Sequence, residues 1–174
     1  MQKIKNIENF LYTQTNNSQI NRLAFQYADG GMEEAGFKKA GDCVVRAICN
    51  ATNLSYRKVL DDLNKLTEEY RLNSNSRLAK KMKPKQNVRR GAYKKVYHDY
   101  ILSLGWEWKP TMQIGQGCTN HLRRGELPNN STMIVRVSKH LTCVINDCIY
   151  DTYDCSREGT RCVYGYYIKQ NTIN

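Results

Sequence analysis

The sequence lacks the features that place a chain in or across a membrane. No stretch of about 18 apolar residues occurs, and residues 1–14, MQKIKNIENFLYTQ, contain no apolar run of the length that a signal peptide needs. We therefore expect a cytoplasmic protein without a membrane partner.

Paired cysteine spacing is also missing. The seven cysteines are odd in number, and no two of them form a Cys-x-x-Cys pair, the spacing typical of structural zinc and redox sites. Cys143, Cys148, Cys155 and Cys162 follow His140 at unpaired spacings, and the alternation of a strand would scatter them over both faces of a sheet. We expect reduced thiols in the cytoplasm and neither a metal nor an organic cofactor.

Acidic residues are absent from one long segment. Residues 71–95, RLNSNSRLAKKMKPKQNVRRGAYKK, hold ten of the 27 Lys and Arg residues, which leaves 17 basic against 16 acidic residues elsewhere, although the net charge is +11. The Asn, Ser, Pro and Gly residues of this segment favour a solvated, mobile loop. The segment could alternatively bind phosphate or an acidic partner. Its candidate binding residues are Lys80, Lys81, Lys83, Lys85, Arg89 and Arg90.

Hydrophobic periodicity divides the remaining chain into helices followed by strands. Residues 1–22 are polar and weakly patterned, and we interpret them as an N-terminal extension. Residues 23–174 form one domain, which 40% hydrophobic composition is sufficient to fold. Helices are expected from Asp42, from Ser55 and over 93–104, and strands over 23–27, 133–137, 140–145, 148–154 and 162–168. A run of helices followed by strands predicts an α+β fold with an antiparallel sheet.

The stretch GDCVVRAICNAT, residues 41–52, places a cysteine in the first turn of the first of these helices. Asp42 is the expected N-cap. The unpaired N–H groups and the dipole of a helix start favour an anion, so they would lower the pKa of the Cys43 thiol and receive an oxyanion. The alternative is a small hydrophobic core residue, which is what we expect of Cys49.

A base and its orienting acid are predicted from the register of the hairpin 140–154. If Asn146 and Asp147 form its two-residue turn, paired residue numbers sum to 293. Asp151 is then the diagonal neighbour of His140, within reach of an imidazole–carboxylate hydrogen bond. The second nitrogen of His140 would be free to take the proton of Cys43. A slip of one residue would reverse this assignment.

The order of these residues carries a resemblance. A cysteine that opens a helix, a Pro-containing turn and strand (GELPNNSTMIVRV), a histidine that opens a strand (SKHLTCVI) and an aspartate in the next one (CIYDTYD) resemble the papain-like cysteine peptidase superfamily, above all its minimal C39-like members. The chain also resembles small proteins encoded by bacteriophages, in stretches such as AGDCVVRAI and RVSKHL. The superfamily resemblance implies helices packed on a sheet, Cys43 as nucleophile, His140 as base and acid, and Asp151 as orienter.

The chain departs from that family at the oxyanion hole. Such peptidases usually carry a glutamine about six residues before the nucleophile, and Phe37 occupies this position. Gln26 could replace the missing donor if residues 28–41 loop back toward Cys43. Trp106 and Trp108 alternate in an extended stretch and are candidates for a cleft wall, although such residues are more often part of the core.

Two functions of different classes follow. The first is a phage-encoded thiol hydrolase, a cysteine peptidase, isopeptidase or amidase, that acts on a host protein in the cytoplasm. The second is a non-catalytic papain-like module that inhibits a host factor, or binds nucleic acid, through residues 71–95.

Overall fold

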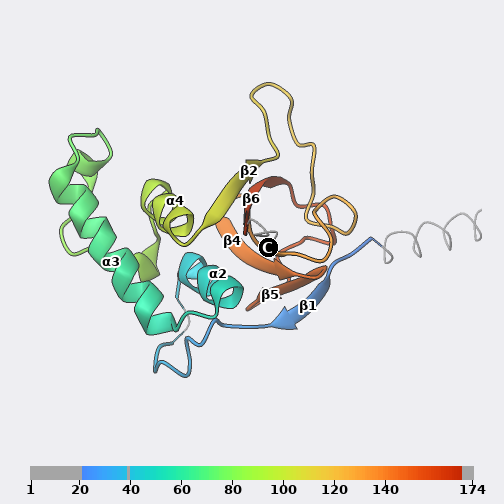
Figure 1. Cartoon of the computed structure of the whole chain (residues 1–174), viewed down its shortest axis with the longest axis horizontal. Helices are drawn as coiled ribbons and strands as arrows, with labels where there is room; N and C mark the ends of the chain where they lie inside the picture. The colour runs from blue at the N-terminus through green and yellow to red at the C-terminus, as the bar shows by residue number, and fades with distance from the viewer. Residues whose placement is uncertain (1–20, 39, 170–174) are drawn as a thin grey trace, which may run out of the picture.

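The computed structural model describes residues 21–38 and 40–169, so nearly all of the predicted N-terminal extension 1–22 lies outside the described residues. The described chain is an α+β structure with one six-stranded mixed sheet and three α-helices (Figure 1). Two short 3₁₀-helices, η1 and η2, interrupt the segment between α3 and α4. The elements are β1 (Ala24–Tyr27), α2 (Cys43–Thr52), α3 (Tyr56–Asn73), η1 (Ala79–Lys81), η2 (Val88–Arg90), α4 (Lys94–Ser103), β2 (Trp106–Pro110), β3 (Thr132–Val137), β4 (His140–Ile145), β5 (Cys148–Asp151) and β6 (Val163–Lys169).

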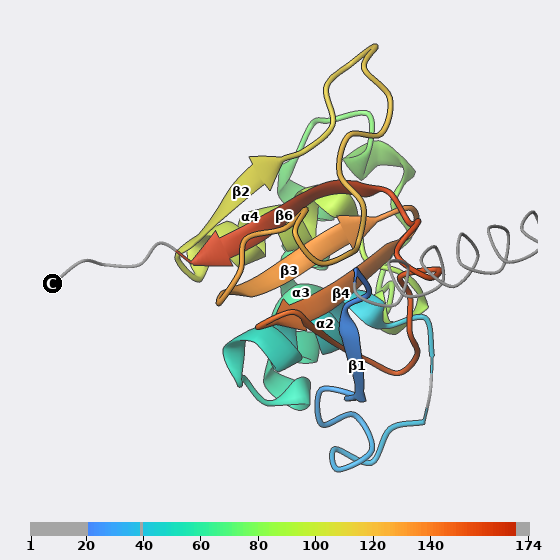
Figure 2. The same ribbon diagram turned by 90° about the vertical axis from the view of Figure 1, so that its right-hand side faces the viewer.

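The sheet has the strand order β1-β5-β4-β3-β6-β2 (Figure 2). Four of its strand pairs are antiparallel, but β1 pairs with β5 in parallel, with Ala24 opposite Cys148 and Tyr27 opposite Asp151. The prediction of a wholly antiparallel sheet is therefore wrong at this edge. Strand direction here depends on a pairing between distant parts of the chain, which local periodicity does not report.

The hairpin of β4 and β5 has the predicted register. Ile145 pairs with Cys148 and Cys143 with Tyr150, across a turn made by Asn146 and Asp147. Both turn residues have positive φ, 47° and 60°, a conformation that Asn and Asp adopt more readily than most residues. This turn fixes which side chains of the two strands share a face, and so determines where His140 and Asp151 point.

The three helices and the sheet share one hydrophobic cluster. Buried side chains of α2, α3 and α4 belong to the same cluster as Ile134, Leu141 and Tyr167 of the sheet, and α2 lies against β4. In Figure 2 the helices lie behind the strands. The predicted Ser55 cap of α3 is confirmed, because its side chain accepts a hydrogen bond from the backbone N–H of Lys58.

A second hydrophobic cluster contains alternate residues of β3, among them Met133, Val135 and Val137, together with Leu122 and Leu127 of the long connection between β2 and β3. A disulfide joins Cys118 of this connection to Cys162, the residue before β6. The expectation of reduced thiols is wrong for this pair. The two residues are 44 positions apart, and only the folded chain brings them together.

The basic segment 71–95 differs from the mobile loop that its composition predicts. Ala79, Met82 and Val88 are buried, and η1 and η2 lie against α3. The side chain of Asn64 in α3 accepts a hydrogen bond from the backbone N–H of Val88. The apolar residues scattered among the charges therefore anchor the segment to the domain.

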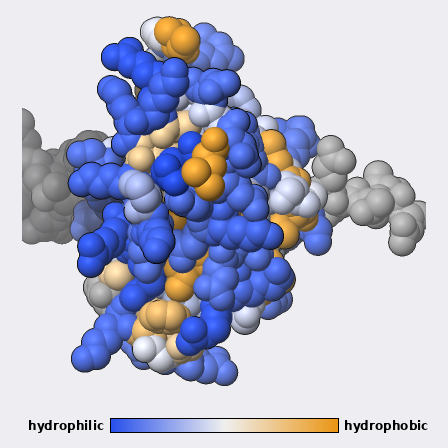
Figure 3. Space-filling model, turned by 90° about the vertical axis from the view of Figure 1, so that its left-hand side faces the viewer, coloured by the Kyte–Doolittle hydropathy of each residue, from blue (hydrophilic) through white to orange (hydrophobic). Residues whose placement is uncertain are grey.

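The face of the molecule that carries α3 is mostly hydrophilic, and its hydrophobic side chains reach the surface in small separate patches (Figure 3). In the part of the chain that the structure describes, no helix has both the length and the apolar composition needed to cross a bilayer.

Candidate functional site

Cys43 is the first residue of α2, as the sequence predicts, and it is half-buried. It lines a cavity of about 350 Å³ together with His140 and Leu141 of β4. Gly91 and Ala92, which precede α4, line the same cavity. The helix start thus presents the thiol to a hollow that the beginning of β4 also lines.

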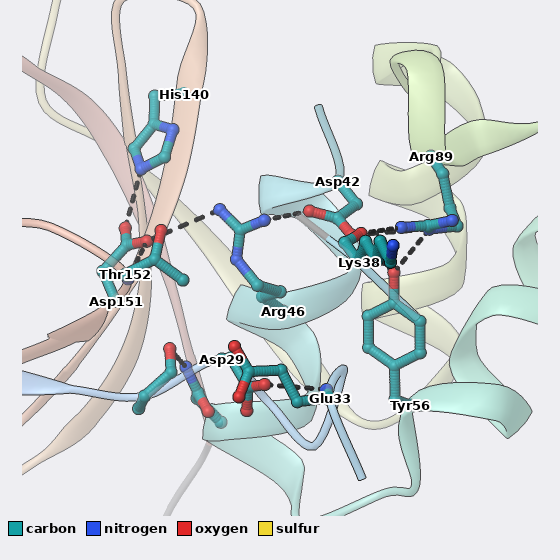
Figure 4. A network of polar contacts seen from close by, with 12 residues as sticks. Asp29, Glu33, Lys38, Asp42, Arg46, Tyr56, Arg89, His140, Asp151 and Thr152 are labelled. Carbon is teal, nitrogen blue, oxygen red and sulfur yellow. Dashed lines mark hydrogen bonds and ion pairs between the residues drawn. The ribbon is translucent and has the colours of Figure 1, made fainter. Parts of the chain in front are cut away.

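His140 and Asp151 form the predicted pair. His140 Nε2 lies 2.7 Å from Asp151 Oδ2, and both residues are buried (Figure 4). The ring of Tyr153 lies 5.3 Å from the His140 ring, centroid to centroid. Because Nε2 is engaged with the carboxylate, Nδ1 is the ring nitrogen that remains for other partners.

The charged forms of Cys43, His140 and Asp151 stabilise one another. Burial would raise the pKa of the Cys43 thiol, but hydrogen bonding with His140, the imidazolium charge and the backbone N–H of Leu141 together lower it below the ordinary value. Burial opposes the charged form of His140, whereas hydrogen bonds with Asp151, Cys155 and Cys43, together with the Cys43 charge, raise its pKa well above 6.5. The pKa of Asp151 is lowered by His140 despite its burial. The lowered pKa of Cys43 and the raised pKa of His140 favour a thiolate beside an imidazolium.

Asp42 precedes α2 as predicted, but its side chain does not cap the helix. It is fully buried and instead pairs with Arg46, one helical turn further on. The other side of the Arg46 guanidinium faces Asp151, with Nη2 3.7 Å from Oδ1 (Figure 4). The N-cap prediction is therefore wrong about the side chain, because a buried arginine competes successfully for the carboxylate. Arg46 links the start of α2 to the carboxylate that orients His140.

A second set of bonds extends from Asp42 toward the basic segment. The hydroxyl of Tyr56 donates to Asp42 Oδ2 at 2.5 Å, and Arg89 Nε donates to that hydroxyl at 3.0 Å. Arg89 also donates to the backbone carbonyl of Lys38 (Figure 4). The Arg89 guanidinium is thus part of the interior network, so the prediction that it belongs to the solvent-facing basic patch is wrong.

The absence of a side-chain cap leaves the first turn of α2 open. The backbone N–H of Arg46 is the first to bond within the helix, to the carbonyl of Asp42. The earlier N–H groups have no acceptor in the helix itself. These N–H groups, at the helix start that carries Cys43, are candidate donors for an oxyanion, and no glutamine takes part.

The structure does not bring Gln26 to Cys43. Gln26 lies in β1 opposite Tyr150, is exposed, and does not line the cavity of Cys43. Phe37, at the position where papain-like peptidases carry their glutamine, packs against the Tyr56 ring at 5.4 Å between centroids. The predicted oxyanion role of Gln26 is wrong because pairing with β5 holds the strand at the outer edge of the sheet.

The two tryptophans do not form a wall of this cavity. Trp106 is buried in the cluster shared with the helices. Trp108 packs against Tyr167, with ring centroids 4.7 Å apart, and edge-on against His98. Neither lines the cavity of Cys43, so the alternative interpretation, that they belong to the core, is the one the structure supports.

Four of the other five residues of the predicted basic patch line a different hollow. It has a volume of about 720 Å³ and contains Lys81, Lys83, Lys85 and Arg90 among its lining residues. Lys80 lies in η1 and is exposed.

Cys155, which spacing and strand alternation excluded as a partner of His140, lies beside His140 and Asp151 in the folded chain. One ligand atom each from His140, Asp151 and Cys155 lie within 4.8 Å of one another, and all three residues are buried. These residues, from two strands and the loop after β5, could together hold a thiophilic cation such as Zn²⁺. Cys155 comes four residues after Asp151, beyond the end of the hairpin, where register arguments no longer apply.

Replacing Asp151 by asparagine is expected to lower the pKa of His140, because the amide supplies no charge to stabilise the imidazolium. In the native protein the raised pKa means that the imidazolium contributes stability fully below about pH 6.5, and that this contribution is lost as the pH rises through the folded-state pKa. Asp151→Asn removes that contribution. NMR titration of the carbon-bound ring protons of His140 measures the change.

Asp154→Asn is the matched control. Asp154 is the neighbouring carboxylate, and it accepts a hydrogen bond from the backbone N–H of Ser156 and not from the imidazole. The His140 titration should be unaltered in this variant. An unchanged titration in Asp151→Asn would show that the 2.7 Å contact does not control the imidazole.

No family model, no curated protein and no solved structure matches this chain. The candidate site therefore depends on its own geometry, a helix-start thiol facing an imidazole that a buried carboxylate holds in place.

Proposed function

We propose that the chain is a thiol-dependent hydrolase that cleaves a peptide, isopeptide or side-chain amide bond. The observation that carries this proposal is that Cys43 and His140 line one cavity while the buried Asp151 holds the His140 ring, with pKa shifts that favour a thiolate–imidazolium pair. The same helix-start cysteine, strand-start histidine and next-strand aspartate support a papain-like arrangement of helices on a sheet. The bacteriophage resemblance supports a host protein in the cytoplasm as substrate.

The proposed reaction has two steps. The Cys43 sulfur attacks the amide carbon, a C–S bond forms, the C–N bond breaks, and the imidazolium of His140 transfers its proton to the departing amine. Water then attacks the thioester, with neutral His140 taking its proton, and releases a carboxylic acid and the thiol. Asp151 holds the ring so that Nδ1 serves both transfers.

In the proposed reaction, the negatively charged oxygen of the tetrahedral intermediate lies beside the start of α2. The first-turn N–H groups, which Asp42 does not cap, are the proposed oxyanion donors. In a known hydrolase the loss of one such donor costs on the order of 10²- to 10³-fold in rate. The missing glutamine would thus slow turnover without removing the nucleophile.

The test is Cys43-dependent acyl transfer from peptides. The protein is incubated with a proteolytic digest of bacterial protein in ¹⁸O-labelled water, and the reaction is quenched with acid. Mass spectrometry then measures the intact mass of the protein and identifies peptide products that have taken up oxygen from the labelled water. We expect a hydroxylamine-sensitive acyl adduct on Cys43, and labelled products that disappear in Cys43→Ala. Labelled products that persist in this variant, or the absence of both adduct and product, would contradict the proposal.

A binding module without turnover is the second candidate, and the basic hollow of about 720 Å³ favours it. In that case the host factor or nucleic acid binds at Lys81, Lys83, Lys85 and Arg90, and Cys43 has no role. The effect of the protein on its host would then be retained in Cys43→Ala and lost when the four basic residues are neutralised. The hydrolase proposal expects Cys43→Ala to abolish it.

A further inference from the structure

The cavity of Cys43 and the basic hollow are neighbours. Consecutive residues line the two, because Gly91 and Ala92 belong to the cavity, whereas Arg90 and Tyr93 belong to the hollow. The short stretch between η2 and α4 therefore has the nucleophile on one side and the basic hollow on the other. A bound chain can reach both by crossing a few residues.

The two linings carry charge of one sign. Arg136 and Lys139 stand beside Cys43 and His140 in the first, and Lys81, Lys83, Lys85 and Arg90 line the second, while no aspartate or glutamate lines either one. These six residues, which line two neighbouring hollows, are here called the basic path. An extended acidic ligand would meet favourable charge along its whole length, and a basic ligand would be repelled.

Arg136 is the member of the path best placed to recognise a single carboxylate. It is half-buried in β3, and it forms no ion pair with any carboxylate among the described residues. Its guanidinium lies 5.6 Å from the centre of the Tyr164 ring, which restricts its orientation. A held guanidinium with free N–H groups binds a carboxylate through two parallel hydrogen bonds. The position beside the nucleophile puts that carboxylate next to the bond under attack.

We propose that the substrate of this site is an acidic polypeptide, with an Asp or Glu side chain next to the scissile amide held by Arg136 and a further acidic stretch along Lys81, Lys83, Lys85 and Arg90. This inference rests on the proposed thiol hydrolase. A polypeptide fits better than a nucleic acid because the path ends at a thiol and an imidazole, which act on an acyl carbon, and a phosphodiester chain has none.

The test measures binding to Cys43→Ala, so that no turnover is required. The probes are a fluorescent glutamate-rich peptide, the same peptide with every Glu replaced by Gln, and a single-stranded oligonucleotide of similar charge. We expect the Glu peptide to bind, and the Gln peptide to bind about 10- to 100-fold more weakly, the range for lost charge-assisted hydrogen bonds. The oligonucleotide should bind more weakly than the Glu peptide.

Substitutions in the basic path test whether the Glu peptide binds there. In the Cys43→Ala background, Arg136→Gln and the double change Lys83→Glu/Lys85→Glu should each weaken the Glu peptide about tenfold or more. The matched control is Lys58→Glu/Lys65→Glu, which makes the same charge change on exposed lysines of α3 that line neither hollow. It should alter affinity about twofold at most.

Three outcomes would overturn the inference. They are equal binding of the Glu and Gln peptides, equal weakening by the control and path variants, and tighter binding of the oligonucleotide with displacement of the peptide. Any of these outcomes would leave the proposal of Cys43-dependent hydrolysis unaffected, because that proposal is tested on a mixture of peptides that are not selected for acidic residues. Selective peptide binding without any acyl adduct would instead contradict the proposed function alone.

Discussion

Cys43 is expected to react with iodoacetamide at pH 6 faster than an ordinary thiol, and Cys43→Ala is expected to remove this fast labelling completely. A thiol with a pKa near 8.5 is about 0.3% thiolate at that pH, so its alkylation is slow. Cys43 escapes this limit because His140 and the Leu141 N–H lower its pKa. Peptide mapping by mass spectrometry assigns the labelled position.

Cys148 supplies the control for this experiment. It is the other half-buried free cysteine in the described part of the chain, and burial raises its pKa. Cys148→Ala should leave the fast phase intact. Fast labelling spread over several cysteines, or labelling of Cys43 no faster than of Cys148 at pH 6, would mean that the thiolate–imidazolium pair does not exist.

Arg46→Met is expected to lower the free energy of unfolding by about 3 kcal/mol or more, in the range found when one partner of a buried ion pair is removed. Arg46 is 4% exposed and lies between Asp42 and Asp151, which are 0% and 3% exposed. Methionine fills part of the space but leaves two buried carboxylates with less compensating charge. Urea denaturation followed by circular dichroism gives the change.

The comparison is Lys58→Met on the exposed side of α3. Lys58 Nζ lies 3.0 Å from Asp62, at a distance typical of an ion pair, but its side chain is 56% exposed. Exposed pairs contribute about 0–1 kcal/mol, so this change should be small. A loss below about 1 kcal/mol for Arg46→Met would show that the buried pairing does not support the domain.

The hairpin explains why much of the site could be predicted from sequence. Asn146 and Asp147 determine a two-residue turn, the turn determines the register, and the alternation of a strand puts His140 and Asp151 on one face. The helix from Cys43 follows equally from local periodicity. Each of these steps depends on residues close together in the sequence.

The predictions that were wrong depend on distant parts of the chain. Gln26 is kept from the cavity by a parallel pairing with β5, and Cys118 meets Cys162 only in the folded chain. The Asp42–Arg46 spacing was visible as a pair one helical turn apart, but the sequence does not show that both are buried. Arg89 was counted as surface charge for the same reason.

The most direct test of the account is an ultraviolet pH titration of thiolate absorbance, recorded as the difference between the native protein and Cys43→Ala. We predict that the thiolate signal of Cys43 persists below the range in which ordinary thiols titrate, near pH 8.5, and that His140→Gln moves it upward. A difference signal that titrates at or above about pH 8.5 in the native protein would contradict the pairing of Cys43 with His140.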